Sequence, residues 1–307
     1  MTRTHESAVS RRSSSVRTWT FLLLIALPPS LSGQVLSLEG WAAFLKSGHA
    51  RLAAAQTDDV RTALNDSLID WWSEALDAGL GRAPELAALD GVLALPEVGR
   101  GDEWVRVISW NVELSDRTQR YGGFILPSDG NGGYEVVPLV HDLRAGSWSN
   151  MGRCDAEHWP GAIYYDVLLT YHRNEPNYTL LGWDGGDALV TRKVVEPLWM
   201  RRGRVRFGHR VIIGEEGLIN RLVLEFADDA VVTLRYEERQ DRIVLDHLSP
   251  SAPHLKGSTA FYGPDMTYDA LVWTKGNWVL QPDVEVADPN MSAPYNPPPN
   301  LRRRRRG

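Results

Sequence analysis

The stretch AVVTLRYEE, residues 230–238, decides the fold class of this chain. Successive side chains of an extended strand point to opposite faces. One face would therefore carry Ala230, Val232, Leu234 and Tyr236. The opposite face would carry Val231, Thr233 and Arg235. An apolar face opposite a mixed one is typical of a half-buried antiparallel strand.

Similar strand-like runs follow one another from Trp104 onward. They include WVRVISWNVEL, AIYYDVLLTYHR, LINRLVLEF and RIVLDHL, and the connections between them are rich in Gly, Asp and Asn. Strands in succession without intervening helices predict a mainly β fold, an antiparallel meander. Such a meander closes as a sandwich, a barrel or a small propeller. The absence of a repeat of fixed length disfavours the propeller.

Residues 34–100 show helical rather than strand periodicity. Leu38, Trp41, Leu45 and Leu52 fall close to one face of a helix. Thr57, followed by two Asp residues, is a good N-cap for a second helix. Pro84 predicts the start of a third helix, which Pro96 would end. The β fold is therefore expected to carry a helical N-terminal portion.

The first 33 residues have the features of a signal peptide. Four Arg residues precede WTFLLLIAL, an apolar run from Trp19 to Leu27, and PPSLSG then offers small residues for cleavage near Gly33. The run is too short to span a bilayer, and no later run is long enough, so no transmembrane segment is expected. Gln34 stands where a lipidated Cys would be needed. These features predict an exported, unlipidated protein of the periplasm or the extracellular space.

The C-terminal residues 287–307 predict a disordered tail. This segment is rich in Pro and ends in five consecutive bases, which are Arg302, Arg303, Arg304, Arg305 and Arg306. The function usually served by such a tail is solubility. The alternative is a weak contact with an anionic surface. The predicted organisation is thus a signal peptide (1–33), a helical region (34–100), an antiparallel β domain (101–286) and the tail.

Charge and cysteine content exclude several classes of protein. The whole chain has a net charge of −6, and removal of residues 1–33, with four Arg and one Glu, makes it more negative. An acidic body is a poor partner for nucleic acid, because attraction to phosphate needs a positive surface. The single Cys154 excludes an intrachain disulfide and a multi-thiolate zinc site.

The stretch YTLLGWDGGDALVTRK, residues 178–193, holds the first candidate site residues, Trp183 and Asp184. Asp-Gly and Gly-Gly supply the positive φ angles of a tight hairpin turn. We therefore expect Asp184, Gly185 and Gly186 to form a turn. A binding or catalytic site would need further acids or His residues brought in by the fold.

Further candidate site residues lie in LDHLSP and YGPDMTYDA. They are Asp246, His247, Asp265 and Asp269. If residues 243–247 form one strand, Asp246 and His247 point to opposite faces and cannot share a site. The sequence contains none of the common nucleophile, zinc-protease or nucleotide-binding motifs. It therefore predicts no metal and no cofactor, and it identifies no catalytic residue.

The strings WPGAIYYDV, YTLLGWDG, LRYEE, DHLSP and YGPDMTYDA resemble an uncharacterised family of exported bacterial proteins. The resemblance extends over most of the chain after residue 33, to about Val286, although Pro160 departs from the Tyr that is typical of that position. No activity is established for that family, so the resemblance implies an exported bacterial protein and no catalytic role.

The favoured function is a non-catalytic binding or structural module with an envelope glycan or a protein as its partner. One alternative is a hydrolase of envelope or extracellular glycans that uses acids near Asp184, Asp246 and Asp269. Another is a carbohydrate-binding module with exposed aromatic rings. The exposure of Trp183, Trp273 and Trp278 discriminates between the alternatives, because a sugar platform needs exposed, coplanar rings.

Overall fold

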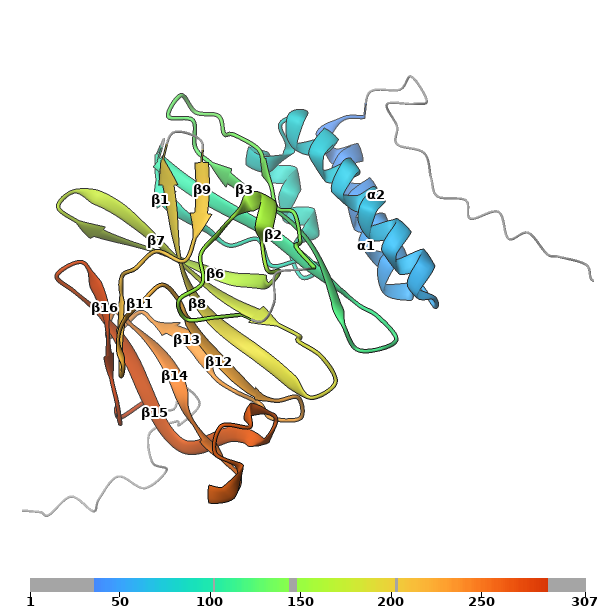
Figure 1. The fold of residues 1–307 in the computed structure, drawn as a ribbon. Coiled ribbons are helices and arrows are strands. Elements are labelled where there is room, and N and C mark those ends of the chain that lie inside the picture. Colours follow the sequence, from blue (N-terminus) through green and yellow to red (C-terminus); the bar gives the residue numbers. More distant parts are fainter. Residues whose placement is uncertain (1–35, 102, 144–147, 202–203, 287–307) are drawn as a thin grey trace, which may run out of the picture.

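The computed structural model describes residues 36–101, 103–143, 148–201 and 204–286 (Figure 1). The predicted signal peptide (1–33) and the predicted tail (287–307) lie outside the described residues. The described part is mainly antiparallel β with a helical N-terminal part, which confirms the predicted fold class. Among these residues, no helix combines the length and the apolar character that a membrane span requires.

Two helices open the described chain, α1 (Leu38–Ala54) and α2 (Asp58–Asp77). Their caps are local, because the Ser37 hydroxyl accepts from the Gly40 N–H at 3.1 Å and the Thr57 hydroxyl accepts from the Val60 N–H at 3.4 Å. The cap predicted at Thr57 is therefore confirmed. Side-chain oxygens at these positions satisfy N–H groups that the first helical turn leaves unpaired.

The predicted third helix is wrong in type and length. The chain instead forms two short 3₁₀ helices, η2 (Leu80–Arg82) and η3 (Pro84–Leu89). Leu86 and Leu89 are the buried residues of η3. Their spacing of three places both on one side of a helix with three residues per turn, whereas an α-helix has 3.6.

The first sheet has four antiparallel strands in the order β1-β2-β3-β4. They are β1 (Glu97–Arg100), β2 (Glu103–Glu113), β3 (Gln119–Pro127) and β4 (Val137–Pro138). Strand β1 lies just before the predicted boundary at residue 100 and pairs with β2.

The second sheet has the order β5-β9-β8-β7-β6, and β12 also pairs with β8. Its strands are β5 (Cys154–Asp155), β6 (Ile163–His172), β7 (Glu175–Asp184), β8 (Val190–Arg201), β9 (Arg204–Phe207) and β12 (Leu222–Ala227), and the short helix η4 (Ala156–His158) follows β5. The first half of β8 pairs with β12 and its second half pairs with β9, so this strand holds the sheet together.

The third sheet has the order β11-β10-β16-β15-β14-β13. Its strands are β10 (Ile212–Gly214), β11 (Gly217–Ile219), β13 (Leu234–Glu237), β14 (Arg242–Pro250), β15 (Tyr262–Thr274) and β16 (Asn277–Gln281), and η5 (Pro253–Leu255) and η6 (Thr259–Phe261) lie between β14 and β15. The pairing of β10 with β16 is parallel, and the other strand pairs in this sheet are antiparallel.

The elements form four layers, with the helices on one side and three sheets stacked behind them (Figure 1). Ile108 of β2 joins the core beneath the helices, whereas its neighbour Val107 joins the core between the first and second sheets. Leu180 and Leu181 of β7 divide in the same way between the second and third cores. The described sheets therefore stack face to face and do not close as a barrel.

Candidate functional site

Asp184 is a buried structural carboxylate at the end of β7. Its Oδ1 accepts from the Tyr121 hydroxyl at 2.7 Å, and its Oδ2 accepts from Trp148 Nε1 at 2.9 Å and from an Arg192 Nη at 2.9 Å. The side chain of Asp184 is only 8% exposed. Because its partners come from three other parts of the chain, the carboxylate holds the first and second sheets together and has little capacity left for a ligand.

The predicted tight turn at Asp184 is wrong. Strand β7 ends at Asp184 and β8 begins at Val190, so residues 185–189 form a longer loop. The Asp187 N–H donates to the Val190 carbonyl at 3.1 Å, and only Gly186 of the two glycines has a positive φ, 59°. The loop is longer because the Asp187 carboxylate accepts from two backbone N–H groups and so forms a turn of its own.

Asp184, at the end of β7, and Asp246, on β14 of the third sheet, lie on opposite sides of the second sheet. Arg192 of β8 binds Asp184. The next residue, Lys193, lies over the Tyr165 ring at 5.1 Å. Burial lowers the pKa of Lys193, and the nearby charge of Asp246 opposes that change. Consecutive strand residues point to opposite faces. These two carboxylates therefore cannot act on the same substrate.

Three of the other candidate residues, His247, Asp265 and Asp269, do lie together. His247 Nδ1 is 2.9 Å from Asp269 Oδ2, and this hydrogen bond, with the nearby charge of Asp265, raises the pKa of His247. Asp246 instead accepts from the Thr233 N–H at 2.6 Å, as its expected orientation away from His247 requires. Among the residues that the structure describes, no three His, Cys, Asp or Glu side chains gather as metal ligands do.

Trp183, Trp273 and Trp278 do not form a sugar-binding platform. Trp278 is fully buried, and its Nε1 donates to the Thr179 hydroxyl at 2.9 Å. Trp273 meets it edge to face, with an interplanar angle of 63°. Trp183 is partly buried. Because Trp278 lies in the core and Trp273 packs against it at a steep angle, the three rings do not form an exposed coplanar set.

A basic pocket of about 550 Å³ is the site that stands out by its charge. It lies where β5, η4, β8 and β9 meet the loop after β9. We call it the basic pocket and define it by its lining residues, Arg153, Cys154, Asp155, His158, Trp199, Arg206, Phe207, Gly208, His209 and Arg210.

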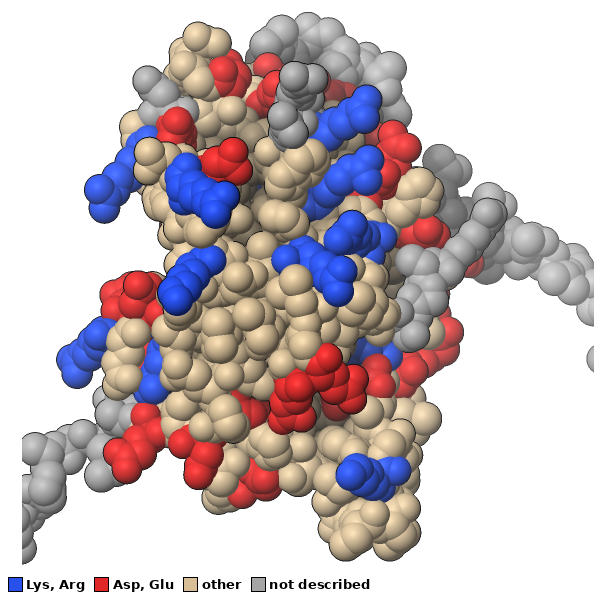
Figure 2. All heavy atoms as spheres, turned by 60° about the vertical axis from the view of Figure 1, so that its left-hand side comes forward, with Lys and Arg blue, Asp and Glu red and all other residues tan. Residues whose placement is uncertain are grey.

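Three guanidinium groups surround the basic pocket. Arg153 donates to the Asn220 side chain at 3.3 Å, and Arg210 Nε donates to the Leu218 carbonyl at 3.4 Å. Arg206 is exposed and forms no ion pair with any described residue. Figure 2 shows several Lys and Arg side chains near one another across the upper and middle part of the face that it presents, with Asp and Glu side chains above, beside and below them.

The only carboxylate among the lining residues is already engaged. Asp155 Oδ1 lies 2.9 Å from His158 Nδ1 and accepts from the Glu157 N–H at 3.2 Å. The hydrogen bond between Asp155 and His158 raises the pKa of His158. Burial and the charge of Arg153 lower the pKa of His209. At neutral pH, His209 is therefore a neutral group that can donate or accept a hydrogen bond inside a positive pocket.

The floor of the pocket is apolar and unreactive. Burial, with the charge of Glu196, raises the pKa of the Cys154 thiol to about 12, so the sulfur stays protonated and is a poor nucleophile. Phe207 stacks on Tyr164 with ring centroids 6.2 Å apart. A side chain at position 208 is excluded, because a Cβ on Gly208, whose φ is 83°, would lie 2.4 Å from the Gly152 carbonyl oxygen.

A buried ion pair supports this floor. An Arg221 Nη lies 2.6 Å from Glu196 Oε1, and both side chains are almost fully buried. The Tyr164 hydroxyl donates to Glu196 Oε2 at 2.7 Å, and Arg221 Nη2 lies 3.4 Å from the Cys154 sulfur. Arg221 Nε has no hydrogen-bond partner among the described residues. The pair therefore links β8 and the residue just before β12 to β5, the strand that carries Cys154.

Sequence reasoning missed the basic pocket. Arg153 and Arg206 are distant in the chain and meet because β5 pairs with β9, with Asp155 opposite Arg206. The signal that was present is the run RRGRVRFGHR at residues 201–210, which concentrates bases in an acidic chain.

No family model, no curated protein and no solved structure matches this chain. The assignment of a function therefore rests on the geometry and charge of the basic pocket.

Proposed function

We propose that this chain is an exported bacterial binding protein whose basic pocket holds the oxyanion of a small ligand. One observation carries the proposal: three Arg side chains surround a pocket whose single carboxylate, Asp155, is bonded to His158. The chain as a whole has a net charge of −6. A local excess of positive charge on an acidic protein attracts anions while leaving the rest of its surface repulsive to them.

The ligand class follows from the donors. Guanidinium groups bind carboxylate, phosphate and sulfate through paired N–H donors. Arg206 is available to make such a pair, and the contacts of Arg153 and Arg210 limit their orientations. Trp199 lines the same pocket and offers an apolar ring surface. An acidic sugar unit of an envelope glycan has both features, an oxyanion and an apolar ring face.

Calorimetric titration tests the proposal with inorganic phosphate, sulfate and glucuronate, and with glucose as the neutral comparison. We expect saturable binding of at least one anion, weaker at high salt because the charges are screened. Arg206→Gln should weaken that binding by about tenfold, the effect of losing one charged hydrogen-bonding partner.

The matched control is Arg239→Gln, which removes the same charge from an exposed position outside the basic pocket. This variant should bind as the unaltered protein does. Equal losses in the two variants would show a general effect of charge, and absence of binding for all three anions would refute the proposed function.

Export is a separate part of the proposal and has its own test. The charged, apolar and small-residue regions before residue 34 support cleavage by a signal peptidase. Intact-mass measurement of protein recovered from exporting cells should give a new N-terminus between residues 30 and 36, with no acyl group added. A retained Met1 would contradict export by cleavage. Within the same proposal, Arg302 to Arg306 add a weak contact with anionic surfaces.

A further inference from the structure

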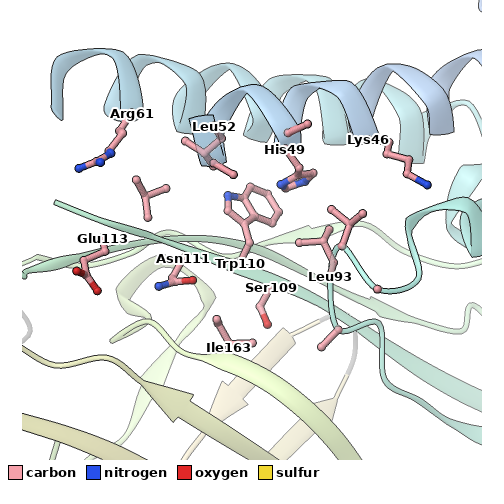
Figure 3. A pocket seen from close by; sticks show the side chains of 16 residues that line it. Lys46, His49, Leu52, Arg61, Leu93, Ser109, Trp110, Asn111, Glu113 and Ile163 are labelled. Atoms are coloured by element: carbon pink, nitrogen blue, oxygen red, sulfur yellow. The ribbon is translucent and has the colours of Figure 1, made fainter. Parts of the chain in front are cut away.

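A second cavity, of about 630 Å³, lies between the helices and the first sheet (Figure 3). We call it the interlayer cavity. It is lined by residues of α1, α2, β2 and the loop before β1, together with Ile163 of β6. Its size is within the range of pockets that hold small molecules, roughly 300–1,000 Å³.

Apolar side chains form most of the interlayer cavity. They include Leu52 of α1, Val112 of β2, Ile163, and Val92 and Leu93 of the loop. Figure 3 shows the Trp110 ring in the middle of the view, between β2 and the helices. Such a lining favours a ligand with a hydrocarbon portion, because burial of apolar surface on both sides is favourable.

His49 provides a hydrogen-bond donor in this apolar setting. The residue is 7% exposed, and its Nε2 accepts from Trp72 Nε1 at 3.0 Å, so the ring proton of the neutral form lies on Nδ1. Burial lowers the pKa of His49 to about 4, which keeps the ring neutral. No described residue accepts a hydrogen bond from Nδ1. Because His49 lines the interlayer cavity, this N–H can donate to the oxygen of a ligand that enters it.

Charge distinguishes the two ends of the interlayer cavity. Lys46 stands one helical turn before His49, on the same side of α1, and has no ion-pair partner among the described residues. At the other end, Arg61 pairs with Asp58 at 3.2 Å and Glu113 lies 3.5 Å from Arg117. The Lys46 end therefore has an uncompensated positive charge, and the Arg61 end is neutralised by the protein itself.

We infer that the interlayer cavity binds an apolar carboxylic acid. Its carboxylate would accept from His49 Nδ1 and lie near the Lys46 ammonium, and its hydrocarbon chain would extend along Leu52, Leu93 and Val112. An alcohol with the same chain keeps the apolar contacts and an oxygen for His49 but loses the attraction to Lys46. This site is independent of the basic pocket and of the function proposed for it.

Calorimetric titration with decanoate and decanol tests this inference on the whole protein. Decanoate should bind saturably and more tightly than decanol. Lys46→Gln should weaken decanoate binding by roughly threefold, the effect of an exposed charge pair, and leave decanol unchanged. Lys256→Gln, an exposed lysine outside the cavity, is the matched charge control.

A second pair of variants tests the position of the ligand without altering the core. Ala50 lines the interlayer cavity but is exposed, so Ala50→Phe should obstruct the cavity and abolish binding of decanoate. Ala54→Phe places the same ring on α1 at an exposed position outside the lining and should bind normally.

Two results would overturn the inference. One is binding of decanoate that survives Ala50→Phe. The other is binding that Arg206→Gln removes, since the carboxylate would then occupy the basic pocket. If phosphate, sulfate and glucuronate fail to bind while decanoate binds as described, the function proposed for the basic pocket fails and the inference stands.

Discussion

Arg221→Met is expected to lower the free energy of unfolding by about 3–5 kcal/mol, because it leaves the buried carboxylate of Glu196 without its cation. Glu196 has no exposed surface and keeps only the Tyr164 hydroxyl as a hydrogen-bond donor in this variant. Chemical denaturation of the variant and the unaltered protein measures the difference. Arg239→Met, a change of the same residue type at an exposed position, should have almost no effect.

The pH dependence of this variant identifies the cause of the loss. Burial raises the pKa of Glu196, and Arg221 opposes that rise. Without Arg221 the folded-state pKa rises further above the unfolded value. A carboxyl of this kind stabilises the fold below its unfolded pKa, and the contribution is lost as the pH rises through the folded pKa. Arg221→Met should therefore be less destabilised at pH 5 than at pH 8.

A double variant separates the buried charge from simple loss of packing. Glu196→Leu combined with Arg221→Met removes both charges and should recover much of the stability that the single variant loses. A double variant less stable than Arg221→Met at pH 8 would show that the two side chains act by shape and not as an ion pair.

Asp184→Asn is expected to destabilise the protein by about 2–3 kcal/mol, because an amide cannot accept every hydrogen bond that the carboxylate accepts. Tyr121, Trp148 and Arg192 all donate to Asp184, and one amide oxygen replaces two carboxylate oxygens. Among the described residues, the substitution also leaves Arg192 with Glu225 as its one remaining ion-pair partner. The sequence alone predicts a small effect, since Asn is tolerated in turns.

Asp187→Asn in the same loop is the matched control. Asp187 is exposed, and its Oδ1 accepts from the backbone N–H groups of Leu189 and Val190. An Asn side chain retains that acceptor, so the free energy of unfolding should change by less than about 0.5 kcal/mol. Thermal unfolding of both variants distinguishes a buried clamp from a turn, and equal effects would contradict the clamp.

The fold class was predictable because successive side chains of an extended segment alternate between a buried face and an exposed face. Val232 and Leu234 are buried and Val231 is 89% exposed, so burial alternates as predicted, although strand β13 itself begins only at Leu234 and not at Ala230. The cap at Thr57 was predictable for a similar reason, since its hydrogen bond is local in sequence. The sequence therefore predicted this burial pattern and this cap, whereas the turn after Asp184 and the helix after Pro84 differ from the prediction although they too are local.

The candidate site was not predictable to the same extent, because its chemistry depends on distant partners. Asp184 belongs to a turn-forming sequence, but Tyr121 and Trp148 convert it into a buried clamp. The three Arg residues of the basic pocket come together only through the pairing of β5 with β9. Alternation along a strand assigns each side chain to a face, but it does not say which strand lies alongside.

The parallel pairing of β10 with β16 has a consequence for the order in which the molecule folds. Ile212 lies opposite Trp278 in this ladder, and the hairpin of β10 and β11 joins the third sheet through β16 alone. The chain between Ile212 and Trp278 must lose conformational entropy before this pairing can form. Non-local pairings of this kind slow folding. The helices and the β2–β3 hairpin depend on contacts between neighbouring segments, whereas the third sheet is complete only when residues near 212 have met residues near 278, so we expect it to form last.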